Sequence, residues 1–190
     1  MGNPIRYWRY LISIGAVVCL AAVGGWWLAV RTINSEPADT LSSPQENPDT
    51  DKRVVHLYFG DAQGRYLRAE QRTIRTKKDE VYFGRLIVEE LIRGPQHSGA
   101  RTLPKDGKIR AFYILDPGTA YIDFEVNAFS GHPGGVGSEL LSIYSVVNSL
   151  ILNSDIIRSV QFLIDGREAV TLAGHLDISR PLTANMLLIR

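Results

Sequence analysis

The sequence has almost no cysteine and almost no net charge, and each absence excludes a class of function. The one cysteine, Cys19, lies inside an apolar run near the start of the chain. The remainder therefore cannot form a disulfide bond or a cysteine-ligated metal site, although a cysteine-free domain is compatible with an oxidising compartment. The formal net charge is +1 at pH 7. With no strong overall field, the net charge gives no argument for an acidic substrate, and nucleic acid is not expected as a partner.

Residue types that commonly build catalytic or metal sites are present without the necessary spacing. No two histidines have the i, i+4 separation with which a helix presents a pair of metal ligands; the four are His56, His97, His132 and His175. No Gly-x-Ser-x-Gly element is present to position a nucleophilic serine. Asp123 and Glu125 alternate along one predicted strand, where surface carboxylates are far commoner than a general acid and base. We therefore expect no catalytic residue, no metal and no cofactor.

Residues 10–30 form an uncharged and mostly apolar run. A membrane-spanning helix needs roughly 20 such residues, and aromatic side chains flank the run as they do at the interfaces of a bilayer. Arg6 and Arg9 precede it, and the positive-inside rule places them in the cytoplasm. The sequence thus predicts a cytoplasmic segment over 1–9 and a single-pass helix in the inner (cytoplasmic) membrane. The rest of the chain would lie on the periplasmic, or otherwise extracytoplasmic, side.

Two other fates of this segment stay open. A cleaved signal peptide has an apolar core of about 7–15 residues, and this run is longer and has no clear cleavage site after it. A lipoprotein would carry its lipid on Cys19, but Val17 and Val18 stand where a small residue is expected. An uncleaved signal anchor is favoured over both. Residues 31–52 follow, rich in proline, serine and scattered acids without periodicity, and predict a flexible linker.

Residues 53–190 carry the periodic patterns of a folded domain. Asp79–Arg93 has apolar residues at helical spacing, with Asp79 itself as the cap, and a second helix is predicted from Ser138 to about Asn153. Short β-branched and aromatic runs predict strands at Val54–Phe59, Arg65–Ile74, Lys108–Leu115, Ala120–Val126, Val160–Ile164, Glu168–Leu172 and His175–Ile178. This order indicates an α+β fold. We expect a mixed or antiparallel sheet with both helices packed on one face.

Several residues have a structural role as their simplest interpretation. Gly94-Pro95 is a helix-ending pair. Ser138 follows a glycine-rich loop, and its side chain is expected to cap the second helix. Asp165-Gly166 stands between two extended runs and predicts a two-residue type I′ hairpin turn. These positions are therefore assigned to turns and caps rather than to chemistry.

The second predicted helix carries no charge between Leu140 and Ser154. One face is apolar and should pack on the sheet; its residues are Leu140, Ile143, Tyr144, Val147, Leu150 and Ile151. Another face presents Ser142, Ser145 and Ser149, although a solvent-facing helix normally carries charges there. Either the domain's own first helix or a loop covers these serines, or they meet an envelope protein partner or a second copy of the chain.

A basic stretch follows the first predicted turn. Its residues are Arg65, Arg68, Arg72, Arg75, Lys77 and Lys78. Such a stretch could approach anionic lipid or a cell-wall polymer. Glu70, Asp79 and Glu80 interrupt it, and charges of this kind also protect the edge of a sheet against unwanted pairing. The protective interpretation is favoured, and the binding interpretation is kept as an alternative.

The order of several short motifs is more specific than any one of them. The motifs are Val54–Phe59, Glu90–Pro95, Leu103-Pro104, Gly137–Glu139, Asn148–Leu150, Val160–Gly166 and Gly174–Ile178. This ordered set resembles the GerMN family of sporulation and spore germination domains. The family often has Asn-Thr-Leu where this chain has Asn148-Ser149-Leu150. The resemblance covers most of residues 53–182, with one such domain rather than a tandem pair.

The resemblance implies a non-catalytic envelope domain with an α/β fold similar to ring-building motifs. Family members are associated with spore envelope assembly, and others occur in bacteria that do not sporulate. The leading hypothesis is therefore a membrane-tethered binding or scaffold protein of the cell envelope. This hypothesis includes a link to sporulation, germination or envelope assembly. The alternatives are an envelope enzyme such as a cell-wall hydrolase, for which no catalytic constellation can be assembled, and a module that binds wall polymer or lipid.

Overall fold

The structure, a computed structural model, describes residues 51–190. These residues belong to one compact unit, Asn47–Arg190. The predicted cytoplasmic segment, membrane helix and nearly all of the predicted linker lie outside the described residues. Within residues 51–190, no helix combines the length and the apolar character needed to cross a bilayer.

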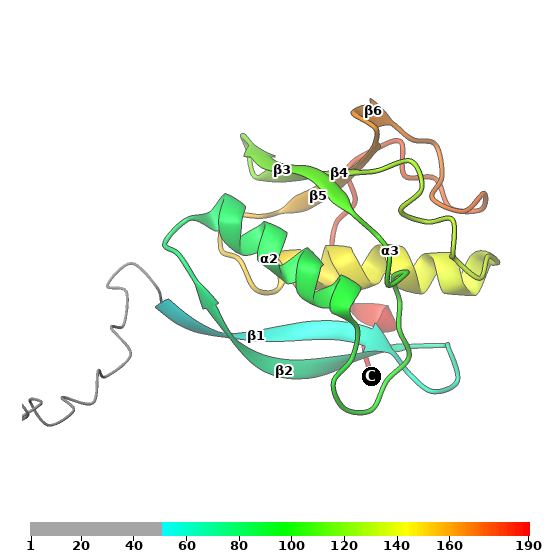
Figure 1. The fold of residues 1–190 in the computed structure, drawn as a ribbon, viewed down its shortest axis with the longest axis horizontal. Coiled ribbons are helices and arrows are strands. Elements are labelled where there is room, and N and C mark those ends of the chain that lie inside the picture. Colours follow the sequence, from blue (N-terminus) through cyan, green and yellow to red (C-terminus); the bar gives the residue numbers. More distant parts are fainter. Residues whose placement is uncertain (1–50) are drawn as a thin grey trace, which may run out of the picture. The chain divides into compact units, whose positions relative to one another are not determined.

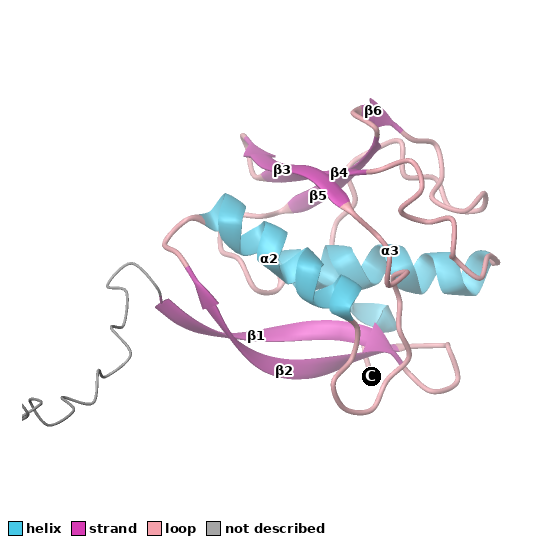
Figure 2. Ribbon diagram, viewed as in Figure 1, coloured by secondary structure: helices cyan, strands magenta, loops and turns pink. Residues whose placement is uncertain are grey.

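The described chain folds into two main helices and six strands, which confirms the predicted α+β class. In order, the elements are β1 (Asp51–Gly60), β2 (Leu67–Thr76), α2 (Glu80–Arg93), β3 (Ile109–Leu115), β4 (Thr119–Phe124), α3 (Val136–Ile151), β5 (Ser159–Ile164), β6 (Arg167–Glu168) and the short 3₁₀ helix η1 (Met186–Leu188). Figure 2 shows the helices and strands in separate colours.

The strands form two sheets instead of the single sheet that was expected. β1 and β2 make an antiparallel pair, and the second sheet has the order β3-β4-β5-β6. It is mixed, because β4 and β5 run parallel while its other neighbours are antiparallel. Both helices lie between the two sheets (Figure 1). Both helices thus lie on one face of the mixed sheet, as predicted, but the prediction of a single sheet missed the β1-β2 pair on their other side.

The physical reason for the two-sheet arrangement is that both helices need cover on two sides. On α2, Phe83, Ile87 and Leu91 are buried, and Gly84 lies so close to the Phe112 ring of β3 that a Cβ atom would meet it at 2.4 Å. On α3, every residue from Leu141 to Leu150 except Tyr144 is buried. One sheet could not exclude water from both sides of such helices.

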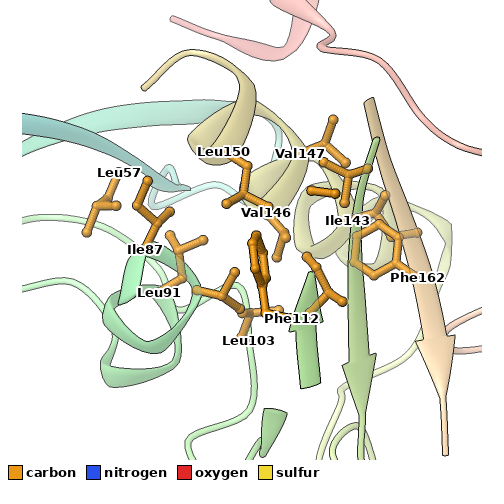
Figure 3. Close-up of a cluster of buried hydrophobic side chains, with 14 of the residues drawn as sticks. Leu57, Ile87, Leu91, Leu103, Phe112, Ile143, Val146, Val147, Leu150 and Phe162 are labelled. Carbon is orange, nitrogen blue, oxygen red and sulfur yellow. The ribbon is translucent and has the colours of Figure 1, made fainter. Parts of the chain in front are cut away.

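The hydrophobic core is continuous between the two sheets (Figure 3). Leu57 of β1 belongs to the same buried cluster as Leu150 of α3, Phe112 of β3 and Phe162 of β5. Each fully buried side chain of this size stabilises the fold by roughly 1.5–3 kcal/mol relative to an exposed one. Packing against both sheets thus fixes the helices in place.

α2 begins and ends as its sequence indicates. The Asp79 carboxylate accepts hydrogen bonds from the backbone N–H groups of Val81 (2.8 Å) and Tyr82 (3.1 Å). Gly94 follows the last turn with a φ of 90°, a conformation that glycine adopts without the strain a side chain would cause. Its N–H group donates to the carbonyls of Glu90 and Leu91.

α3 begins earlier than predicted, and Ser138 does not cap it. The cap position is Gly135, and no side chain bonds the free N–H groups there. Ser138 lies inside the first turn, where its hydroxyl donates to the carbonyl oxygens of Gly134 and Gly135. A serine within a helical turn bonds a preceding carbonyl in this way, so the hydroxyl is not available as a capping acceptor.

The region after β5 is less regular than predicted. Asp165 and Gly166 have φ values of 49° and 75°, the positive sign that a type I′ turn requires at both positions. The returning strand β6 is only two residues long, and the described residues contain no strand at 175–178. Instead, Leu182 makes an isolated antiparallel bridge with Val160 of β5.

Candidate functional site

The serines of α3 are hydrogen-bonded to one edge of β1. The N–H of Tyr58 donates to Ser149 Oγ (3.0 Å), and Ser145 Oγ donates to the Tyr58 carbonyl (2.6 Å). One turn further on, the Asn153 side chain accepts from the N–H of His56 (2.9 Å) and donates to its carbonyl (2.8 Å). Two residues of α3 and one just after its last turn, spaced four residues apart, thus take the place of a neighbouring strand.

This arrangement corrects the hypothesis that Ser142, Ser145 and Ser149 meet a partner. Their exposed fractions are 2%, 0% and 0%. Ser142 donates to carbonyls of the same domain, and Ser145 Oγ lies 2.7 Å from the hydroxyl of Thr102. In the folded domain these side chains are bonded to β1 and to the loop around Thr102, so the interpretation in which the domain covers its own serines is the correct one.

The other edge of the hairpin, on β2, is open over most of its length. In an antiparallel pair, the N–H and C=O groups of one residue point together, either toward the partner strand or away from it. The two directions alternate from residue to residue along the strand. His56 and Tyr58 direct their N–H and C=O groups away from β2. In the register of the pair, His56 lies opposite Gln71 and Tyr58 lies opposite Ala69. By the same alternation Ala69, Gln71, Thr73 and Arg75 point away from β1. No group of residues 51–190 bonds to these outward peptide groups.

A groove runs between this open edge and α2. Its volume is about 430 Å³, and residues 71–75 of β2 form one wall. Leu86, Glu90 and Arg93 of α2 form the other wall, with Gln96 of the following loop at one end. The groove therefore combines unpaired backbone groups with polar and charged side chains.

A buried ion-pair network lies beneath the groove. Arg72 Nε and Nη2 donate to Glu70 Oε1 at 2.7 and 2.5 Å, and Arg72 Nη1 donates to Glu90 Oε2 at 2.8 Å. Arg72 Nη2 also donates to the carbonyl of Gly94 at 2.6 Å. Side chains with this many fixed partners hold one conformation. The network therefore joins β2, α2 and the residue after α2, Gly94, into a rigid floor for the groove.

The Glu70 carboxyl is held in its ionised form. Burial alone would raise its pKa, but the Arg72 guanidinium and the backbone N–H groups of Gln96 and His97 lower the pKa below its usual value. A carboxylate that accepts several hydrogen bonds behaves in this way. Glu70 is therefore a structural anion rather than a proton donor at neutral pH.

Positive charge predominates along the walls of the groove. Arg72, Arg75 and Arg93 face the one acid, Glu90, which is shared between Arg72 and Arg93. The Arg93 side chain is 63% exposed. The predicted basic stretch is thus divided, because Arg72 is buried and paired while Arg65, Arg68, Arg75, Lys77 and Lys78 are exposed.

A second buried acid, Glu139 on α3, was not identified from the sequence. It is fully buried, and its carboxylate accepts from the N–H groups of Leu172, Ala173 and His175 and from His175 Nδ1. Burial would raise its pKa, but these hydrogen bonds lower it. Glu139 thereby fixes the loop that follows β6, which explains why 175–178 is not a strand.

The remaining candidate carboxylates and histidines do not converge. Asp123 is buried and accepts from the N–H of Gly166 at 2.8 Å, so it supports the hairpin turn. His132 bonds Ser142, and His175 bonds Glu139. Within residues 51–190, no group of three or more histidine, cysteine or acidic residues is placed to hold a metal ion.

Comparison with known families decides the classification. The model of the Germane family, described as sporulation and spore germination, matches residues 56–170. The chain belongs to this family. The match spans the hairpin, both helices and the mixed sheet up to β6, so the groove lies inside the family domain.

Several solved structures resemble this member of the Germane family. A putative lipoprotein from Clostridium perfringens is 26% identical with a TM-score of 0.51, over 70% of this chain and 87% of that one. The tandem GerMN domains of the sporulation protein GerM from Bacillus subtilis are 25% identical with a TM-score of 0.56, over 70% of this chain and 46% of that one. The first of those domains alone is 24% identical with a TM-score of 0.54, over 69% of this chain and 97% of that one. This likeness shows a shared fold. No curated protein sequence matches the chain.

Proposed function

We propose that this Germane protein is a membrane-tethered, non-catalytic binding or scaffold protein of the cell envelope. Residues 10–30 would anchor it in the cytoplasmic membrane, and residues 31–52 would link the anchor to an extracytoplasmic domain over 53–190. Family membership supports a role connected with sporulation or germination. The relative from Clostridium perfringens, described as a putative lipoprotein, supports attachment to a membrane.

The observation that carries the non-catalytic part of the proposal is the state of the buried acids. A general acid at neutral pH needs a raised pKa, whereas the pKa values of Glu70 and Glu139 are both lowered. Their oxygens already accept hydrogen bonds from the surrounding fold. A groove with such a floor favours recognition of another chain over proton transfer.

Membrane attachment and orientation can be tested with reporters. The full chain should sediment with membranes and resist extraction by high salt. A reporter that is active only outside the cytoplasm should be active when fused after Arg190, and one that is active only in the cytoplasm should be silent. Release of the intact chain by salt, or the reverse reporter pattern, would contradict the proposal.

A further inference from the structure

We propose that the open edge of β2 binds an extended acidic segment of a partner protein as an added third strand. This inference deepens the proposed function, because it assigns the binding role of the domain to the groove between β2 and α2. The strand would pair with the backbone of Ala69–Arg75. Acidic side chains on its two faces would lie near Arg75, on the outer face of the hairpin, and Arg93, on the α2 side.

The first support is the hydrogen-bonding capacity of the edge. Ala69, Gln71, Thr73 and Arg75 direct their peptide groups away from β1, and nothing else in residues 51–190 bonds to them. Exposed sheet edges of this kind are templates for a further strand. On the opposite edge of the hairpin, Ser145, Ser149 and Asn153 occupy the peptide groups of His56 and Tyr58, so β2 provides the longer open side.

The second support is that an extended segment already pairs with the first residue of this edge. Ile189 forms a parallel bridge with Leu67, and the N–H of Arg190 donates to the Leu67 carbonyl at 2.9 Å. This contact shows that the edge accepts a neighbouring backbone. It covers Leu67 only, and residues 69–75 remain for another chain.

The third support is charge, which selects an acidic occupant. Three arginines and one glutamate line the groove. Arg72 is already paired with Glu70 and Glu90, so the charge left for a ligand is that of the exposed Arg75 and Arg93. A second copy of this chain would bring an equally basic β2, with exposed Arg68 and Arg75, against the first, and exposed Lys77 directly follows that strand. Like charges on adjacent strands are destabilising, so the same edge of another copy is a poor partner.

The test uses the full chain in a neutral detergent and a fluorescent peptide of five Thr-Glu repeats with blocked ends. The matched peptide has lysine in place of glutamate. The acidic peptide should bind and slow amide exchange at Gln71 and Thr73, while the lysine peptide should not. Acidic binding without this protection, or equal binding of both peptides, would overturn the inference.

Thr73→Pro addresses the backbone contacts. Proline removes an N–H group that points away from β1, a position where edge strands tolerate it. Affinity for the acidic peptide should fall about tenfold or more, the effect of losing about 1.4 kcal/mol. Thr73→Ala, which keeps the N–H group, is the matched control and should bind as the unmodified chain does. Equal affinity of a folded Thr73→Pro chain and the control would refute strand addition.

Arg75→Glu addresses the charge and does not depend on tolerance of proline. It should also weaken acidic-peptide binding about tenfold, whereas Arg167→Glu on exposed β6 makes the same charge change elsewhere and should have no effect. Binding of phosphatidylglycerol vesicles through Arg75 without peptide binding would identify an anionic-surface contact and overturn the inference. The membrane attachment assays use neither peptide nor vesicle, so the proposed function fails or stands separately.

Discussion

Replacing Arg72 with methionine should destabilise the folded domain by about 3 kcal/mol. The substitution keeps most of the side-chain volume and leaves two acids, Glu70 and Glu90, buried without their shared cation. Breaking a buried ion pair by removing one partner costs about 3–5 kcal/mol. Here Glu70 keeps the N–H groups of Gln96 and His97, and Glu90 keeps Arg93. This remaining compensation places the expected loss at the lower end of that range.

Urea unfolding of the full chain, followed by circular dichroism, would measure the loss. The matched control is Arg93→Met, which removes a 63% exposed partner of the same Glu90. Exposed ion pairs contribute about 0–1 kcal/mol, so the control should remain close to the unmodified chain.

The pH dependence of the Arg72→Met loss gives an independent check. Because the folded-state pKa of Glu70 is lowered, its stabilising contribution is complete above the unfolded pKa of about 4.3 and disappears as the pH falls through the folded value. Without Arg72, burial dominates and the folded pKa rises. The difference between the two proteins should therefore shrink as the pH falls from the raised folded pKa of the variant to the lowered folded pKa of the unmodified chain. A loss under about 1 kcal/mol at pH 7, or a loss independent of pH, would refute the network as described.

Three further predictions follow from the fold. Ser145→Glu with Ser149→Glu should cost about 3 kcal/mol or more in thermal unfolding, because two unpaired charges would be buried; a stable double variant would show that α3 does not cap β1. Gly166→Val should cost about 1–3 kcal/mol through strain at its positive φ, whereas Gly166→Asn should cost less, and equal melting midpoints would contradict the turn. Glu139→Gln should reduce the stability lost on acidification below about pH 4.3, because the pKa of Glu139 is lowered. If the free energy of unfolding falls with acid as steeply in the variant as in the unmodified chain, the role of Glu139 is contradicted.

Local signals in the sequence were sufficient for the elements with strong ends. Asp79 and Gly94 delimit α2, and alternating β-branched and aromatic residues delimit β1 and β5. Ser138 was misassigned, because Gly134 and Gly135 both have positive φ and start α3 earlier than its serine suggested. Pairing of the strands into two sheets depends on contacts between distant segments, which periodicity does not specify.

The residues of the groove were harder to predict than the elements that carry them. Arg72 and Glu70 lie on the strand face that points inward, yet their charges indicated a solvated face. Their partner Glu90 lies on another element, and its burial depends on how α2 crosses the hairpin. The uncharged Ser145 and Ser149 did indicate a covered face, but the cover is a strand edge that only the tertiary fold brings to them.

The side-chain cap on β1 also limits the stoichiometry of any assembly through this hairpin. A two-stranded ribbon with both edges open could add strands on both sides and grow without end. Ser145, Ser149 and Asn153 close the β1 side at His56 and Tyr58, so the ribbon has one long acceptor edge, on β2. Each copy of the domain can then recruit a strand on one side of this sheet only, so growth of the sheet in both directions is excluded.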